Sequence, residues 1–228
     1  MKKTIILGLT LIASWSNATQ ITNKSSQQEQ IGYSYGYNFG KNFSESLQDI
    51  NLDAFIQGIK EGSKGIKATL TDKEMAQALA AYKQQSEAKQ LVNFKNKANE
   101  NQKKAQAFLD NNAKQAGVIT RPSGLQYQII QSGAGKAPSA KSRVSVNYEG
   151  RLIDGTVFDS SIARQQPTEF QVSQVIAGWT EGLQLMKEGA KYRFFVPANL
   201  AYGEIGSGDA IEPNSALIFD VELLKVLP

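Results

Sequence analysis

Any chemistry in this chain has to proceed without cysteine or histidine, because neither occurs among its 228 residues. The lack of cysteine excludes a thiol nucleophile, a disulfide framework and a thiolate metal site. The lack of histidine removes the usual general base and the commonest zinc ligand, and with them the serine hydrolase triad. Gly206-Ser207-Gly208 suggests a phosphate loop, but no strand-to-helix transition and no Lys-Ser/Thr pair follows it. We expect neither a metal nor a cofactor.

The residues with a chemical signal form ordered runs in the last hundred positions. These runs are Val146-Asn147-Tyr148-Glu149-Gly150, Asp154-Gly155-Thr156-Val157-Phe158-Asp159-Ser160-Ser161, Gln174-Val175-Ile176-Ala177-Gly178-Trp179-Thr180-Glu181-Gly182, Ala201-Tyr202-Gly203, and Leu217-Ile218-Phe219-Asp220-Val221-Glu222-Leu223-Leu224. In this order and at these spacings they resemble the FKBP-type family of peptidyl-prolyl cis-trans isomerases. The resemblance covers about Gly124 to Leu227.

The resemblance implies a shallow apolar pocket with Trp179, at the start of a helix, as its floor. Its walls would be formed by Tyr148, Phe158, Val175, Ile176, Tyr202, Ile211 and Phe219. Asp159 would be the one buried charge at the rim, and Arg164 stands where the family often has a basic residue that can pair with it. Thr168 replaces an aromatic residue and Ser207 replaces a frequent histidine. Both departures bear on substrate preference and macrolide affinity rather than on activity.

The chemistry implied by the resemblance suits a chain without histidine. The barrier to rotation about an X-Pro bond arises from amide resonance and is roughly 20 kcal/mol. The twisted transition state loses that resonance, so an apolar pocket favours it over the planar amide by differential binding, with no proton transfer. Trp179 and Phe219 are assigned to the proline ring, and the Ile176 N–H and Tyr202 hydroxyl to the peptide carbonyls. Asp159 would orient or polarise the site.

Each of these residues also has a plainer interpretation. Apolar residues in alternating strands are usually core, and Asp159 could be a turn residue. As an ordered set, the aromatic residues favour a pocket. Two alternative functions stay open, since one pocket would serve all of them: a module that binds proline-containing peptides with incidental turnover, and a surface virulence factor.

The elements that must position these residues change character near Thr120. Apolar residues alternate with polar ones from there, as expected of strands, at Leu125, Tyr127, Ile129, Val144, Val146, Tyr148, Phe194, Val196, Leu217, Phe219, Val221 and Leu223. Asp154-Gly155 is a hairpin turn signal, and Val175 to Met186 indicates one short helix. Residues 118–228 are therefore expected to form an α+β domain, an antiparallel sheet wrapped on one helix. We expect a fragment from about Gly117 onward to fold alone.

The N-terminal half is predicted to be helical. Between Gln30 and Leu47 an apolar residue recurs every four positions, at Ile31, Tyr35, Phe39, Phe43 and Leu47. Gly32, Gly36 and Gly40 recur at the same interval, one position further round the helix. A glycine row lets another backbone approach closely; the plainer alternative is a helix weakened by its glycines. A second helix is expected from Leu52 to Gly65.

A long connecting helix is predicted over residues 71–117. Thr71 and Glu74 form a capping box at its start. No glycine follows until Gly117, the expected C-terminal cap, and apolar residues become sparse beyond Tyr82. The segment is therefore expected to be a solvent-exposed rod, with a coiled coil as the alternative.

The helical half, residues 19–70, is similar to the dimerising segment of the macrophage infectivity potentiator and FkpA-like proteins, envelope FKBP-type isomerases of Gram-negative bacteria. This similarity implies a homodimer through the N-terminal helices. The expected partners are unfolded or exported polypeptides that contain proline, and macrolide inhibitors of the tacrolimus and rapamycin type are expected ligands.

The first eighteen residues are predicted to be a cleaved signal peptide. Lys2 and Lys3 precede an apolar run from Ile5 to about Trp15, and Ser16-Asn17-Ala18 supplies small residues for cleavage. The run is shorter than the roughly 20 residues of a membrane-spanning helix, and no other stretch approaches that length. Removal of the two lysines lowers the formal net charge from +4 to +2, which argues against nucleic acid as a partner. The expected location is the periplasm or cell envelope, with outer-membrane association or surface exposure left open.

Overall fold

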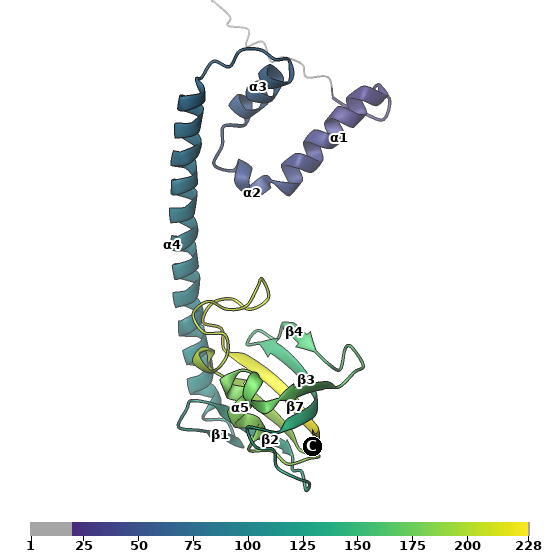
Figure 1. The fold of residues 1–228 in the computed structure, drawn as a ribbon, viewed down its shortest axis with the longest axis vertical. Helices are drawn as coiled ribbons and strands as arrows, with labels where there is room; N and C mark the ends of the chain where they lie inside the picture. Colours follow the sequence, from purple (N-terminus) through teal and green to yellow (C-terminus); the bar gives the residue numbers. More distant parts are fainter. Residues whose placement is uncertain (1–19, 228) are drawn as a thin grey trace, which may run out of the picture. The chain divides into compact units, whose positions relative to one another are not determined.

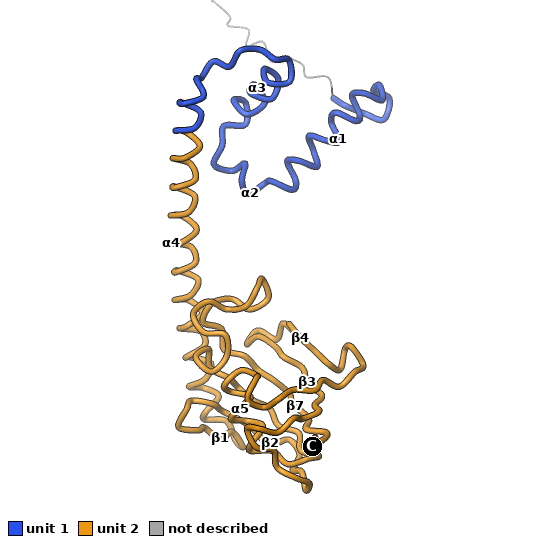
Figure 2. Tube along the Cα trace, in the orientation of Figure 1, with its two compact units in different colours: residues 1–77 blue, residues 78–228 orange. Residues whose placement is uncertain are grey.

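The computed structural model describes residues 20–227, so the predicted signal peptide over 1–18 lies outside the described residues. The elements in chain order are α1 (Gln27–Asn42), α2 (Ser44–Leu47), α3 (Leu52–Ser63), α4 (Asp72–Asn112), β1 (Val118–Thr120), β2 (Gln126–Gln131), β3 (Arg143–Leu152), β4 (Val157–Ser160), β5 (Thr168–Gln171), η1 (Val172–Gln174), α5 (Ala177–Leu183), β6 (Lys191–Val196), η2 (Ala198–Leu200) and β7 (Leu217–Leu227) (Figure 1). The chain divides into two compact units between Gln77 and Ala78, inside α4 (Figure 2).

The described part of the first unit contains the helices α1, α2 and α3 and the first turns of α4. α1 begins at a capping box in which the Glu29 N–H donates to Ser26 Oγ over 3.3 Å and the Ser26 N–H donates to Glu29 Oε2 over 2.8 Å. The helix predicted from Gln30 to Leu47 is interrupted at Phe43, which has φ −112° and separates α1 from α2. No residue of α1, α2 or α3 is buried in the single chain.

The long helix α4 starts where the sequence predicted. The Thr71 N–H donates to Glu74 Oε2 over 2.8 Å and the Glu74 N–H donates to Thr71 Oγ1 over 3.3 Å, which confirms the capping box. Its C-terminal end differs from the prediction, because the helix stops at Asn112 and Gly117 lies beyond it, in the turn before β1, with φ +80°. Gln126, in β2, contacts this end: its Nε2 donates to the Leu109 carbonyl, which also accepts from the Ala113 N–H over 2.9 Å.

The prediction that α4 is an exposed rod throughout is wrong for its last third. Ala105 and Leu109 are buried against Phe195 and Ala216 of the β-rich domain. Because these two α4 residues are four apart, they lie on one face of the helix. Apolar residues are sparse here, but a narrow stripe is enough when a sheet face is available to cover it.

The second unit is built on one antiparallel sheet with strand order β1-β2-β6-β7-β3-β4, and β5 pairs with β3 as well. The predicted alternation is confirmed: Val144, Val146 and Tyr148 are buried along β3. The hairpin at Asp154-Gly155 is also confirmed, with Gly155 at φ +92°. The α+β class, with a helical N-terminal region, a long helix and a sheet wrapped on one short helix, is thus confirmed.

The short helix α5 covers the inner face of the sheet. A Cβ added to Gly182 would lie 2.7 Å from the Phe194 ring, so only glycine lets α5 approach β6 this closely. The helix predicted from Val175 to Met186 is shorter in the structure, where a 3₁₀ turn, η1, precedes it. The core between helix and sheet includes the fully buried Leu125, Leu183 and Phe194.

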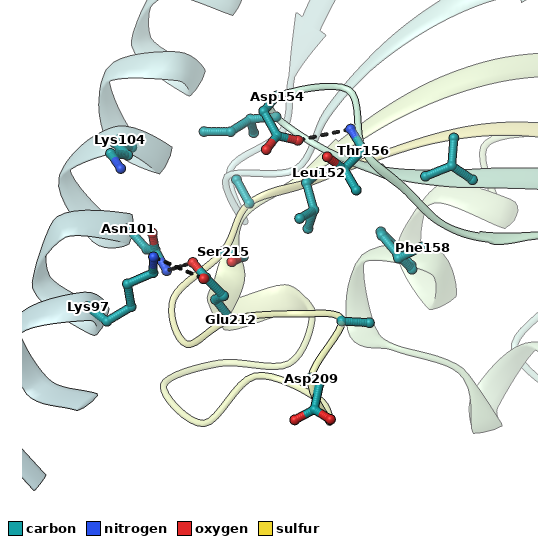
Figure 3. A pocket seen from close by; sticks show the side chains of 14 residues that line it. Lys97, Asn101, Lys104, Leu152, Asp154, Thr156, Phe158, Asp209, Glu212 and Ser215 are labelled. Carbon is teal, nitrogen blue, oxygen red and sulfur yellow. Dashed lines mark hydrogen bonds and ion pairs between the residues drawn. The ribbon is translucent and has the colours of Figure 1, made fainter. Parts of the chain in front are cut away.

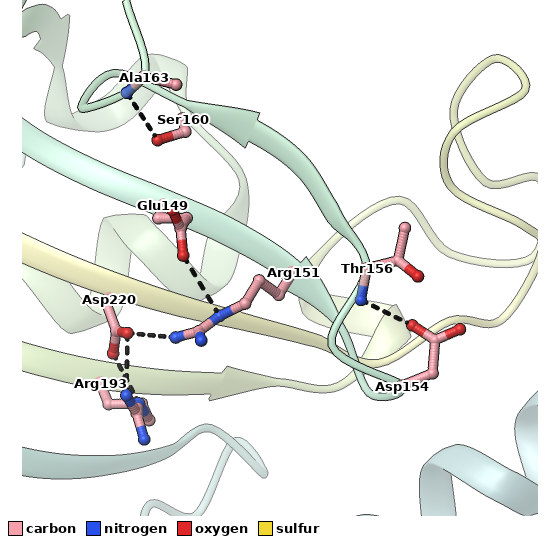
Figure 4. Close-up of polar contacts among 8 residues, drawn as sticks. All are labelled: Glu149, Arg151, Asp154, Thr156, Ser160, Ala163, Arg193 and Asp220. Atoms are coloured by element: carbon pink, nitrogen blue, oxygen red, sulfur yellow. Dashed lines mark hydrogen bonds and ion pairs between the residues drawn. The ribbon is translucent and has the colours of Figure 1, made fainter. Parts of the chain in front are cut away.

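The outer face of the sheet carries the side chains that alternate with this core. Asp220 follows the inward-facing Phe219 along β7 and accepts hydrogen bonds from Arg193 Nε at 2.6 Å and Nη2 at 2.9 Å (Figure 4). Arg151, on β3, donates to the same carboxylate, and its Nε lies 3.8 Å from Glu149 Oε1. The paired charges therefore link β3, β6 and β7 on the face opposite Phe219.

Within residues 20–227, no helix combines the length and apolar character needed to cross a bilayer.

Candidate active site

A cavity of about 350 Å³ lies between α5 and the inner face of the sheet. It is lined by Tyr148, Phe158, Asp159, Phe170, Gln174, Val175, Ile176, Trp179, Tyr202 and Phe219. These side chains come from β3, β4, β5, η1, α5, β7 and the segments before α5 and after η2. The volume is within the range of small-ligand sites, and the lining is mostly aromatic and aliphatic.

Trp179, in α5, lines the cavity and is surrounded by aromatic rings. Three rings meet it edge to face, with centroid distances of 5.2 Å to Tyr148, 5.6 Å to Phe170 and 5.3 Å to Phe219. Only 4% of Trp179 is exposed, and its indole Nε1 is buried without a hydrogen-bond partner among the described residues. The indole is therefore held rigidly by neighbouring rings rather than by a polar contact.

A glycine of β3 makes room for the opposite wall. Gly150 pairs in register with Phe219 on one side and with Asp159 on the other. A Cβ at Gly150 would lie 2.7 Å from the Phe158 ring and 2.8 Å from the Phe219 ring. Those two rings consequently cross over Gly150 with centroids 5.6 Å apart at 90°. Any larger residue at this position would push the wall into the cavity.

The charged edge of the cavity is a triad of Tyr148, Asp159 and Arg164. The Tyr148 hydroxyl donates to Asp159 Oδ2, and Arg164 Nη1 donates to Asp159 Oδ1. Arg164 Nη2 also donates to the Tyr148 hydroxyl oxygen over 3.1 Å, and its guanidinium carbon lies 5.8 Å from the centre of the Tyr148 ring. Each member of the triad thus fixes the other two.

The triad sets the ionisation of its members. Partial burial, the largest single influence, acts to raise the pKa of Asp159, but the hydrogen bonds from Tyr148 and Arg164 together outweigh it and the pKa is lowered. Burial, followed by the hydrogen bond to Asp159, raises the pKa of the Tyr148 phenol. Near neutral pH the edge therefore holds an ionised carboxylate that accepts from a neutral phenol.

The two groups assigned from the sequence as hydrogen-bond donors to the peptide carbonyls, the Ile176 N–H and the Tyr202 hydroxyl, belong to residues that line this cavity. Ile176 is the N-cap of α5, and its carbonyl accepts from the N–H groups of Trp179 and Thr180 at 3.0 Å. Its own N–H precedes the helix and is not part of the helical hydrogen-bond ladder. The Tyr202 side chain, 39% exposed, contributes a hydroxyl that can reach a bound peptide.

The structure brings most of the sequence-predicted residues together. Eight line the cavity, namely Tyr148, Phe158, Asp159, Val175, Ile176, Trp179, Tyr202 and Phe219. Arg164 lies outside the lining and acts on the site through Asp159, whose side chain is 40% exposed rather than a buried charge.

Ile211 is placed differently from the expected pocket wall. It is 5% exposed, packs in the domain core and does not line the cavity. A short bridge explains this position: the Ser207 N–H donates to the Ile211 carbonyl over 2.8 Å, and the Ile211 N–H returns a bond of 3.1 Å. The backbone of Ser207 therefore stabilises the loop between Tyr202 and β7.

Sequence reasoning missed two lining residues, Phe170 and Gln174. Phe170 lies two residues after Thr168 in β5, and positions two apart in a strand share a face. Thr168 itself does not line the cavity. This alternation was visible in the sequence. Gln174 ends η1, and the sequence carried no signal for that turn.

Two family models match the chain. One, described as FKBP-type peptidyl-prolyl cis-trans isomerase, matches residues 134–224, and another, described as the domain amino terminal to FKBP-type peptidyl-prolyl isomerase, matches residues 28–129. The first covers nearly all of the cavity-bearing domain. The second covers α1 to α4 and continues into β2.

Relatives match over most of the chain. The "Outer membrane protein MIP" of Legionella longbeachae is 43% identical over 97% of this chain and 94% of its own length. The "Peptidyl-prolyl cis-trans isomerase Mip" of Coxiella burnetii is 40% identical over 92% of each chain. Among solved structures, the crystal structure of FkpA from Escherichia coli matches with a TM-score of 0.76 and 36% identity, covering 90% of this chain and 98% of that one.

Proposed function

This chain belongs to the family of FKBP-type peptidyl-prolyl cis-trans isomerases, and from that premise we propose that it assists the folding of exported proteins as a homodimer. The family membership makes it an enzyme that accelerates rotation about X-Pro bonds. The observation that carries the proposal for this site is the aromatic cavity around Trp179, with the ionised carboxylate of Asp159 at its edge.

The cavity suits differential binding of a twisted amide. Uncatalysed rotation takes tens of seconds, since the planar amide is stabilised by charge separation between nitrogen and carbonyl oxygen. An apolar lining solvates that separated charge poorly and accepts the twisted amide, which has lost it. We assign the proline ring to the cavity that Trp179 and Phe219 line together, where the two rings meet edge to face with centroids 5.3 Å apart.

The polar groups hold the peptide while the bond turns. The Ile176 N–H and the Tyr202 hydroxyl are the donors we assign to the carbonyls flanking the proline. Asp159 acts through its contacts: it holds the Tyr148 ring and the Arg164 guanidinium at the edge of the cavity. No step requires a proton to leave the protein, which agrees with the absence of histidine.

A protease-coupled assay on a short X-Pro tetrapeptide tests the catalytic site directly. The protease cleaves only the trans isomer, so the slow phase reports isomerisation. We expect the mature protein at micromolar concentration to abolish most of that slow phase. A slow phase unchanged by the protein would reject catalysis and leave the peptide-binding alternative.

The homodimer rests on the apolar surface of the first unit. Its helices expose Tyr33, Tyr35, Tyr37, Phe39 and Phe43, between 41% and 77% each, more than a monomeric soluble domain leaves uncovered. A Cβ added to any glycine of the row 32, 36 and 40 would meet no atom within 4 Å. A second copy of the same helices supplies the missing partner.

The proposed location and ligands follow from the relatives. One relative is named as an outer membrane protein, which supports a place in the cell envelope for this chain. The proposed substrates are unfolded exported polypeptides that contain proline, and the aromatic cavity is the proposed site for macrolides of the tacrolimus and rapamycin type. Phe170 adds an aromatic ring to the lining of this cavity, which supports macrolide binding there.

A further inference from the structure

A second and larger cavity, of about 800 Å³, lies beside the active site (Figure 3). One wall is α4, which contributes Lys97, Asn101 and Lys104. The other walls are the β3–β4 hairpin and the segment that leads into β7, and they contribute Leu152, Ile153, Asp154, Thr156, Val157, Phe158, Asp209, Ala210, Glu212, Ser215 and Ala216. We call this space the α4 groove. All of its residues belong to the second compact unit.

Phe158 belongs to both cavities. Its ring meets Phe219 in the active site and also lines the α4 groove. The two spaces therefore adjoin at one side chain of β4. A polypeptide that leaves the active site past Phe158 reaches the α4 groove directly.

The walls of the groove are held together by hydrogen bonds between α4 and the loop. Asn101, 9% exposed, donates from Nδ2 to Glu212 Oε2 and to the Pro213 carbonyl, each over 3.0 Å. Lys97 Nζ lies 3.0 Å from Glu212 Oε1, and Asn214 Nδ2 donates to the Ala98 carbonyl over 3.2 Å. A preformed site avoids the ordering cost that otherwise weakens binding.

The lining has the character of a peptide site. Leu152, Val157 and Phe158 offer apolar surface, and Val157 is 49% exposed although it lies in a strand. Lys104 lines the α4 side, and Asp209 lies on the loop side (Figure 3). Apolar surface between charges of opposite sign suits an extended chain with apolar side chains and an acidic residue toward Lys104. Among the described residues no cluster suited to a metal ion is present.

We propose that the α4 groove binds the segment of an unfolded substrate that flanks the proline held in the active site. The proposal rests on the isomerase function. Under this proposal the C-terminal part of α4 contacts the substrate, in addition to covering the sheet. Once proline is bound, the flanking segment is at high effective concentration at the groove, so long substrates gain affinity that tetrapeptides lack.

The absence of cysteine from the chain allows a site-specific test. In the full-length protein, Lys104→Cys introduces one thiol in the groove, and Lys103→Cys places a matched thiol on the next residue of α4, which does not line it. The probes are twelve-residue peptides, each with one central proline and one cysteine that is activated as a mixed disulfide. Across the set, the cysteine lies two to six positions before or after the proline. Crosslinking rates are normalised to each thiol's rate with a small disulfide reagent.

We expect normalised crosslinking to Lys104→Cys to be at least tenfold faster than to Lys103→Cys, at a few neighbouring offsets on one side of the proline. Excess tetrapeptide substrate, or alanine in place of the proline, should remove that preference. Equal normalised rates at the two positions, or a preference that survives both controls, would overturn the proposal.

Charge reversal provides a second readout. Lys104→Glu should raise the KM of a twelve-residue peptide with an acidic residue at the best offset by about threefold, while Lys103→Glu leaves it unchanged. Tetrapeptide turnover measures the isomerase function separately: it should equal wild type in all four variants. If wild type itself fails to turn over tetrapeptide, the isomerase function is at fault and not the groove.

Discussion

The side-chain amide of Gln126, in β2, donates a 2.9 Å hydrogen bond from Nε2 to the main-chain carbonyl of Leu109, in the last turn of α4. Asn112 Nδ2 donates in turn to Gln126 Oε1 over 2.8 Å. Gln126 is 4% exposed, so both ends of its amide are satisfied within the protein. The end of α4 is therefore built into the catalytic domain.

The first prediction concerns where that domain begins. A fragment of residues 117–228 lacks α4 and exposes the faces of Phe195 and Ala216 that the helix covers. We expect it to be less stable than residues 78–228 by about 3–6 kcal/mol, the burial energy of the two large apolar side chains in this contact, Leu109 and Phe195. Urea unfolding of both fragments measures the difference. Leu109→Ala in the longer fragment should cost about 2–5 kcal/mol, and equal midpoints for the two fragments would show that α4 contributes no stability.

A second prediction concerns the cavity floor. Phe219→Tyr should lower kcat/KM on a tetrapeptide about tenfold or more, because an unpaired hydroxyl in an apolar site costs about 1–3 kcal/mol. Phe195→Tyr is the matched control, since it makes the same change on the α4 side of the sheet, and its activity per folded molecule should equal wild type. Trp179→Ala is a poorer probe, because it removes three ring contacts and should unfold the domain. Loss of activity in both phenylalanine variants alike would show that the effect comes from folding.

The third prediction concerns pH. Asp159 has a lowered pKa in the folded protein, so its ionised contacts are present at neutral pH and are lost as pH falls through that lowered value. Without histidine or cysteine, we expect kcat/KM on a tetrapeptide to be flat between about pH 5 and pH 8. Arg164→Gln removes a hydrogen bond that lowers this pKa. The acid limb of the pH profile, where kcat/KM falls as Asp159 is protonated, should therefore move to higher pH. Asp159→Asn should lower activity at neutral pH and abolish that limb. A limb at the same pH in Arg164→Gln, with native circular dichroism, would exclude Asp159 as its origin.

The fourth prediction concerns the glycine row of α1. Gly36→Leu raises the intrinsic helix propensity by nearly 1 kcal/mol but fills the space that the proposed second copy approaches. We expect it to weaken the dimer at least tenfold in sedimentation equilibrium. Ser34→Leu, on the opposite side of the helix, should leave the dimer intact. A tighter dimer in Gly36→Leu would mean that the glycines only weaken the helix.

The fifth prediction concerns large substrates. Per active site, residues 78–228 should match the full-length protein on a tetrapeptide, which occupies one cavity. On an unfolded protein whose refolding is limited by proline isomerisation, the proposed full-length dimer should be several-fold faster, because two linked sites raise the effective concentration for the second contact. Refolding kinetics at equal site concentration provide the comparison. Equal rates would assign the dimer a purpose other than holding unfolded chains, and a full-length protein that sediments as a monomer would remove the premise.

Much of the catalytic domain was predictable from period-two alternation, since inward and outward residues differ in polarity along β3 and β7. The capping box at Thr71 was predictable as well, because it involves residues only three apart. Ile211 was not, because its burial depends on a bridge to Ser207 within an irregular loop. Phe170 was missed because an aromatic was expected at Thr168, although both lie on one face of β5.

The sequence by itself determined what the site could not be and which side chains compose most of it. A chain without histidine or cysteine cannot support the usual general base or thiol chemistry, and the resemblance of its ordered runs to the FKBP-type family pointed to eight residues that line the cavity. Only the tertiary structure decided that the end of α4 covers Phe195, and that Phe158 separates two cavities. The physical reason is that alternation and helical periodicity are local properties of a chain. Burial and cavity shape depend on surfaces brought together from distant parts of it, and a sparse apolar stripe does not reveal its partner.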